Sequence, residues 1–296
     1  MDFANFFQFA LSGLITGCVY ALVAIGFVLC ANVSGIVNFA QGEFVMIGGV
    51  IAAGFVAMQI PLAVAVASAV IAGATLGLLQ ERLTVAPMRH APMFLQATVA
   101  LAVSVLIRSV ALVTMGKDPY GMAGFSGDDV FELLGAYLPM QALWVWGATA
   151  ALLAVTFWLL RFTDLGRAIR AVSINPRAAE LMGIRTGRMT MLVFAASGGA
   201  GALVGVVVAP ITSASWDSGL EFGVKGFTAA IIGGFRSPAW ATLAALGLGA
   251  LESLSAGYVS SSTKDIVTYG VLLLYLMIRG GVFAIGGRSE SRAASL

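Results

Sequence analysis

The feature that most constrains this chain is a series of long apolar stretches separated by short polar segments. A helix needs about 20 apolar residues to cross the hydrocarbon core of a bilayer. With 59% hydrophobic and 10% charged residues among 296, the chain leaves no room for a separate soluble domain. We therefore predict an all-α polytopic membrane protein, with residues 1–296 forming a single integral-membrane domain. Hydropathy predicts about eight transmembrane helices, at residues 6–31, 35–58, 62–81, 94–115, 141–161, 189–210, 238–256 and 264–282.

One further apolar piece, GFTAAIIGGF at 226–235, is too short to span a bilayer. Its Gly233-Gly234 pair can end a helix, and Ser237 followed by Pro238 is a favourable start for the next one. We interpret the piece as a half-helix that ends near the middle of the membrane, as in transporters. The alternative is a short surface helix joined to the next span by an ordinary loop.

Basic residues are concentrated in three segments. Arg82 follows the third span, six arginines lie between Arg161 and Arg188, and Arg279 begins a third group near the C-terminus. By the positive-inside rule these segments and the C-terminus lie in the cytoplasm. The arginines lack interleaved aromatic residues and adjoin membrane spans, so we do not predict binding of nucleic acid.

Two segments, 117–139 and 211–225, are richer in Asp and Glu than in Lys and are predicted to face outward. This orientation requires residues 226–235 to enter from the outer face and the 238–256 helix to return to it. Three pairs of glycines four residues apart mark positions where helices can approach closely: Gly13 and Gly17, Gly73 and Gly77, and Gly201 and Gly205.

Charged residues inside predicted spans are costly unless they are paired or face a cavity. Glu43 either lines a translocation pathway or locks two helices by accepting N–H bonds from a broken backbone. Glu252 is a gate or a helix-pairing residue, with extension to water as the alternative. We expect Arg108 to extend outward to water, and pairing with Glu43 or Glu252 is the alternative. The candidates for the pathway or for helix breaks are Asn38, Gln41, Gly42, Glu43, Gly233, Gly234 and Glu252.

The segment 162–188 is a basic loop that contains SINPRAAELMGIRTGR at 173–188. Asn175 is a favourable N-cap, Pro176 suits the first helical position, and Gly183 can adopt the left-handed conformation after the helix. The predicted helix, 176–182, is too short to be stable alone. It either docks into a groove on a soluble partner or lies on the lipid headgroups.

Three ordered motifs resemble permeases of the branched-chain amino acid ABC importer family, and most resemble the first of its two permease subunits. A-A-E-x-x-G-I occurs at 178–184, and the stretch 226–252 is similar to a second conserved region. The third, N-F-A-Q-G-E at 38–43, resembles the family signature N-F-A-H-G-E. Gln41 replaces the usual histidine, so no role that needs an imidazole is expected there.

The resemblance implies a permease in the bacterial inner membrane that works with a second permease subunit, two cytoplasmic ATPase subunits and a periplasmic substrate-binding protein. It implies a branched-chain or other hydrophobic amino acid as substrate, with urea, short amides or aromatic acids as alternatives. The residues implied in coupling to the ATPase are Asn175, Pro176, Arg177, Ala178, Ala179, Glu180, Leu181, Met182 and Gly183. The sequence has no G-x-x-x-x-G-K-[ST] motif, so ATP and Mg are expected on the partner ATPase subunits and no cofactor on this chain.

Two other classes of protein are alternatives to this interpretation. An ion-coupled secondary transporter would need no ATPase and could use Glu43 as its coupling carboxylate. An enzyme would need a catalytic constellation, but the sole histidine, His90, follows an arginine in a polar loop and no carboxylate pair at helical spacing lies in a span. We predict no catalytic residue and no metal site.

Overall fold

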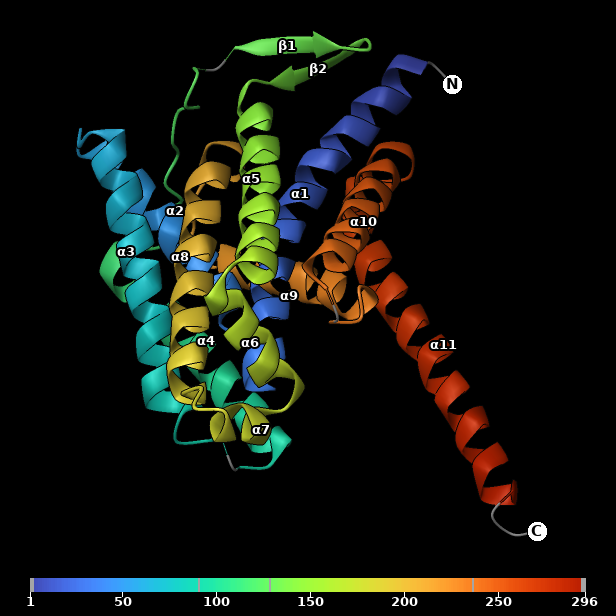
Figure 1. The fold of residues 1–296 in the computed structure, drawn as a ribbon. Helices are drawn as coiled ribbons and strands as arrows, with labels where there is room; N and C mark the ends of the chain where they lie inside the picture. The colour runs from blue at the N-terminus through green and yellow to red at the C-terminus, as the bar shows by residue number, and fades with distance from the viewer. Residues whose placement is uncertain (1–2, 90, 128, 236, 294–296) are drawn as a thin grey trace.

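The computed structural model describes residues 3–89, 91–127, 129–235 and 237–293, with side chains of the last helix up to Arg279 (Figure 1). His90 lies outside the described residues. This part of the chain is built from α-helices and one small sheet. The helices are α1 (Phe3–Ser34), α2 (Gln41–Ala57), α3 (Leu62–Gln80), α4 (Met93–Met115), α5 (Gln141–Phe162), α6 (Asp164–Ile174), α7 (Pro176–Leu181), α8 (Thr186–Thr212), α9 (Ser218–Ile232), α10 (Pro238–Tyr258) and α11 (Lys264–Ala293).

Within the described residues, 6 helices are long and apolar enough to cross a membrane. They confirm a polytopic all-α membrane protein. A π-helical turn (Glu81–Val85) extends α3, and a 3-10 turn (Ser261–Thr263) precedes α11. The 6 helices that are long and apolar enough to cross a membrane are Asn5–Ser34, Leu62–Val85, Phe94–Met115, Gln141–Phe162, Thr186–Thr212 and Pro238–Tyr258.

Two helices are shorter than the spans around them. The predicted span 35–58 was too long, because Gly35 has a φ of +72° and the helix begins only at Gln41. The predicted half-helix 226–235 is the end of α9, which starts at Ser218 and ends at Ile232. Most of α9 from Gly219 to Ala230 is buried, so the surface-helix alternative is wrong.

The chain repeats one pattern in opposite directions, a long helix followed by a short one and then two longer ones (Figure 1). In the first half these are α1 to α4, and in the second α8 to α11. Gln8 in the second turn of α1 contacts the sheet, whereas the residues after the last turn of α8 pair with the segment after α4 through Tyr120 and Ala214. The two long helices that open the halves therefore run in opposite directions.

The glycine pairs lie at close helix crossings, as predicted. A Cβ on Gly17 would lie 2.8 Å from the Cα of Leu246 in α10. Gly73 and Gly77 in α3 meet the α8 backbone in the same way, and Gly205 of α8 meets α2. These contacts enclose α1 and α8. In the most apolar stretch of 18 residues, 78% of α1 and 67% of α8 are therefore buried, against 17% of α4 and of α5.

The sheet is a hairpin of β1 (Val130–Leu133) and β2 (Ala136–Pro139), in antiparallel register with Val130 opposite Pro139. Leu134 and Gly135 form the turn with φ values of 55° and 79°, as the right-handed twist of a two-residue hairpin requires. The sequence predicted only an outward-facing polar segment here. Gln8 accepts a hydrogen bond from the Tyr137 N–H (2.7 Å) and donates one to its carbonyl (2.9 Å), which fixes the hairpin beside α1.

Candidate translocation and coupling sites

The short helix α7 is closed at both ends by its own residues. Asn175 Oδ1 accepts a hydrogen bond from the Ala178 N–H (3.1 Å), and Pro176 occupies the first turn. At the other end Gly183 has a φ of +84°, and the Gly183 and Ile184 N–H groups donate to the carbonyls of Glu180 (2.9 Å) and Ala179 (3.0 Å). This is the pattern of a Schellman cap. The predicted start and stop of the helix are thus confirmed, with its last residue at Leu181.

One side of α7 packs against the rest of the protein, and the other side is exposed. Ala179 is 4% exposed in a cluster with Val172 and Ile184, and Glu180 accepts a hydrogen bond from Thr186 Oγ1 (2.5 Å) at the start of α8. Leu181 and Met182 are 89% and 83% exposed, and Arg177 and Ala178 are exposed too. The preceding α6 ends in Ile174, which is also exposed. Residues 174–182 therefore carry an apolar surface that the described part of the chain leaves uncovered.

Neutral side chains tie the start of α2 to its neighbours. Gln41 Oε1 accepts a hydrogen bond from Ser197 Oγ (2.9 Å), and Gln41 Nε2 donates to the Ser197 carbonyl (3.3 Å). Gly26 leaves the space that the Gln41 amide fills. Asn38 does not cap α2 itself; its Oδ1 accepts from the Ala40 N–H (3.1 Å) in the preceding turn and from Gln80 Nε2 (2.6 Å).

Gly42 lies where α2 crosses α9, since a Cβ there would be 2.7 Å from the Cα of Gly223. The next residue, Glu43, is 1% exposed and accepts hydrogen bonds from Ser104 Oγ (2.8 Å) and Arg108 Nη2 (2.6 Å) of α4. The expectation that Arg108 extends outward to water was wrong, and its pairing with Glu43 is the alternative that holds. Glu43 joins two helices through side-chain donors, and not through the backbone N–H groups of the predicted alternative.

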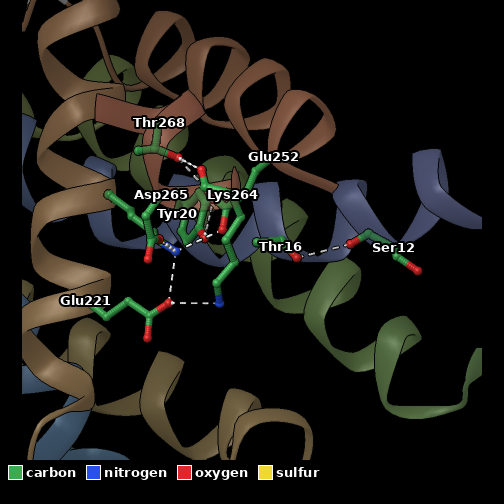
Figure 2. A network of polar contacts seen from close by, with 9 residues as sticks. Ser12, Thr16, Tyr20, Glu221, Glu252, Lys264, Asp265 and Thr268 are labelled. Atoms are coloured by element: carbon green, nitrogen blue, oxygen red, sulfur yellow. Dashed lines mark hydrogen bonds and ion pairs between the residues drawn. The ribbon is translucent and has the colours of Figure 1, made fainter. Parts of the chain in front are cut away.

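A second buried charge cluster joins four helices (Figure 2). Glu252 of α10 accepts hydrogen bonds from Tyr20 Oη (2.9 Å), Lys225 Nζ (2.8 Å) and Thr268 Oγ1 (3.2 Å). Lys225 is 1% exposed, so Glu252 pairs helices instead of reaching water. Nζ of Lys225 also lies 2.9 Å from Glu221 and 3.2 Å from Asp265.

The interpretation of 211–225 as an outward-facing polar segment missed that its last residues form the start of α9 and that Lys225 is buried. Two signals in the sequence could have located it. Glu221 and Lys225 have the i, i+4 spacing of a helical ion pair. Glu252 lies inside an apolar helix, and a buried carboxylate needs a cation.

The break between α9 and α10 has the predicted local chemistry. Gly234 has a φ of +74°, and the Gly234 and Phe235 N–H groups donate to Ile231 and Ala230, closing α9 with the same cap as α7. Ser237 Oγ accepts from the Ala239 N–H (3.3 Å), and Pro238 begins α10. A Cβ on Gly233 would lie 2.6 Å from the Cα of Ala241, so the short turn needs glycine.

A cavity of about 220 Å³ lies between α1, α5, α6 and α8. Its wall is almost wholly aliphatic, and Gln41 and Ser197 supply polar groups. Such a surface can accept an apolar side chain and has no charge that would repel a carboxylate. Within the described residues no group of three His, Cys, Asp or Glu side chains could hold a metal ion.

Known proteins are similar to this chain over most of its helical region. The family model for the permease component of the branched-chain amino acid transport system matches residues 9–276. The high-affinity branched-chain amino acid transport system permease protein LivH of Escherichia coli K12 is 30% identical over 293 residues, 94% of each chain. BraD of Pseudomonas aeruginosa, with the same description, is 29% identical over 93% of this chain and 94% of its own.

More distant relatives share part of the sequence or the fold alone. The ribose import permease protein RbsC of Escherichia coli K12 is 28% identical over 221 residues, 73% of this chain and 66% of its own. A solved structure of PsaBC from Streptococcus pneumoniae in complex with Fab matches with a TM-score of 0.50 and 14% identity over 91% of both chains. This last likeness shows a shared fold.

Proposed function

This chain belongs to the family of branched-chain amino acid transport system permease components, and from that premise we propose that it forms half of the translocation pathway of an ATP-driven importer. It is a transmembrane permease of the ABC importer class, and it works with partner subunits. The other half of the pathway would come from a second permease subunit. The cavity between α1, α5, α6 and α8 supports this proposal, because its aliphatic wall suits the side chain of leucine, isoleucine or valine.

The power for transport would come from two cytoplasmic ATPase subunits that bind ATP and Mg. The observation that carries this proposal is α7, a helix of 6 residues with its own caps and with Leu181 and Met182 exposed beside Ile174. A helix this short with an uncovered apolar tip is suited to a groove on a soluble protein. In the proposed assembly α7 and the C-terminus lie in the cytoplasm and the hairpin β1–β2 lies outside, where a periplasmic binding protein would deliver the substrate.

A displacement of α7 has a direct mechanical route into the membrane region. Glu180 is hydrogen-bonded to Thr186, the first residue of α8, and Ala179 is packed against the same cluster as Val193 and Phe194. Because α8 in turn holds Gln41 through Ser197, movement of α7 would carry α8 and the start of α2 with it. We expect the caps of α7 to keep the helix rigid during this motion.

An ion-coupled secondary transporter is disfavoured by the state of Glu43. Its carboxylate would have to bind and release an ion, but Oε1 is engaged by both Ser104 and Arg108, and the side chain is 1% exposed. A carboxylate fixed beside a guanidinium is suited to holding helices together.

Reconstitution in vesicles tests the proposed function. We expect uptake of leucine, isoleucine or valine only when the second permease, the ATPase subunits, the binding protein and ATP are all present. Uptake that persists without an ATPase subunit and follows an ion gradient would reject the importer mechanism. Calorimetry on the cognate binding protein tests the substrate separately: affinity for urea or an amide, and none for the three amino acids, would reject it.

A further inference from the structure

A second cavity, of about 280 Å³, lies where the end of α5 and the middle of α6 face the start of α10. Its floor is apolar and includes Leu153, Phe157 and Leu160. Arg161 and Arg170 line it from two different helices, and Ser237 and Pro238 line it from the α9–α10 break. The cavity therefore combines an apolar wall with two cationic groups.

Neither arginine is paired with a carboxylate of the described residues. In the described part of the chain, Arg89, Arg108 and Arg167 each form an ion pair with a carboxylate, and neither Arg161 nor Arg170 does. Arg161 is held instead with its guanidinium 5.6 Å from the centroid of the Phe157 ring. Two arginines thus line one cavity, and no carboxylate among the described residues neutralises them.

The position of the cavity indicates the kind of anion. Gln141–Phe162 is one of the candidate spans, and Arg161 is in its last turn, where a span meets the lipid headgroups. Guanidinium groups bind phosphate oxygens in pairs of parallel hydrogen bonds, and basic pockets between helices at this level suit anionic lipid headgroups. A free phosphate would satisfy the arginines but leave the apolar floor uncovered.

We propose that this cavity binds an anionic phospholipid, with its phosphate between Arg161 and Arg170 and an acyl chain along Leu153 and Phe157. The lipid bridges α5, α6 and α10. Because α6 leads directly into α7, the bound lipid holds α6 in place, and with it the exposed Leu181 and Met182 that follow. The site does not depend on which substrate the permease carries.

The test compares two pairs of substitutions of equal charge in the full chain. Arg161→Gln with Arg170→Gln removes the cavity cations, and Arg185→Gln with Arg188→Gln removes two exposed arginines at the same end that do not line the cavity. Each protein is purified from nanodiscs of equal parts phosphatidylglycerol and phosphatidylcholine, and bound lipid is counted by native mass spectrometry. We expect the unaltered chain and the control pair to retain phosphatidylglycerol, and the cavity pair to retain about tenfold less.

A third variant, Ala239→Trp, fills the cavity without changing charge and covers the case in which the cavity pair fails to fold. It should also lose the retained lipid. Equal loss in the cavity and control pairs would show general surface attraction and overturn the proposal. Unchanged retention in the cavity variants would overturn it too, as would displacement of the lipid by inorganic phosphate alone, which would indicate a site for a free anion.

Discussion

The two short helices, α2 and α9, both contain a buried ion pair, but the surroundings of the two pairs differ. Each carries one buried charge, Glu43 in α2 and Lys225 in α9, and each charge is paired with another helix. The Glu43 pair is compact: Glu43 is 1% and Arg108 18% exposed, and among the described residues both Glu43 Oε2 and Arg108 Nε are buried without a hydrogen-bond partner. The Lys225 cluster extends to the surface, because Glu221 and Asp265 are 52% and 51% exposed.

The two ion pairs hold different helices in place. Lys225 and Glu252 tie together α1, α9, α10 and α11, so α9 is fixed on several sides (Figure 2). Glu43 connects α2 to α4 alone, and α4 has only 17% of its apolar window buried. We infer that α9 is a fixed element of the fold, whereas the position of α4 depends mainly on one buried pair.

The largest effect is expected from Lys225→Met. It leaves Glu252 as an unpaired buried carboxylate, and breaking a buried ion pair from one side costs about 3–5 kcal/mol. Thermal unfolding of the purified chain in detergent measures the loss. Lys264→Met is the matched control, since Lys264 is 45% exposed and 3.9 Å from Glu221, and should cost less than about 1 kcal/mol. Equal losses of stability in Lys225→Met and Lys264→Met would contradict the inference that the buried Lys225 pair fixes α9.

Arg108→Gln should cost less, about 2–3 kcal/mol, because water reaches part of the Arg108 side chain and can solvate Glu43. The double variant Glu43→Gln with Arg108→Gln leaves no buried charge and should recover part of that loss. Unfolding midpoints of the single and double variants give the coupling between the two sites. Additive losses would mean that the pair does not hold α4 to α2.

Gly183→Val imposes a left-handed conformation on a β-branched residue and should cost about 1–2 kcal/mol locally at the end of α7. We expect normal assembly with ATP hydrolysis that no longer drives uptake, measured as substrate transported per ATP hydrolysed. Gly183→Asn is the control, because asparagine tolerates this conformation better. If the Val variant transports with the normal ratio, α7 has no role in coupling.

Among the changes measured by unfolding, the smallest effect belongs to the neutral hydrogen bonds that hold α2. Gln41→Leu removes two hydrogen bonds to Ser197, and the net loss should be about 1–2 kcal/mol. Ser197→Ala keeps the Gln41 Nε2 bond to the backbone carbonyl and should cost less. Unfolding measurements on both check the order. A loss from Gln41→Leu as large as that from Arg108→Gln would show that the ion pair holds α2 no more strongly than the neutral hydrogen bonds do.

The sequence predicted best what depends on neighbouring residues. The caps of α7 and the α9–α10 break follow from Asn175, Gly183, Gly234 and Ser237, whose conformational preferences act within a few residues. The close helix crossings at Gly13 and Gly17 followed in the same way from spacing. Family motifs identified the permease class from the order of residues alone.

Features that depend on residues distant in the chain were not predictable in this way. Lys225 meets Glu252 only when α9 folds back against α10, so its charge was interpreted as a sign of solvent. Arg108 faced three possible environments, and nothing in a single sequence fixes which face of α4 meets α2. The hairpin β1–β2 was missed because its strands are only 4 residues each and lie in a polar segment.

The proposed coupling depends most on α7 meeting an ATPase subunit. Leu181→Cys places a reactive thiol at the exposed tip, since the natural Cys18 and Cys30 are both buried. In the assembled transporter we predict that this thiol is cross-linked to the ATPase subunit by a short bifunctional reagent, and that bound ATP changes the yield. Protection by lipid-embedded quenchers, with no cross-link to any protein in either nucleotide state, would contradict the account.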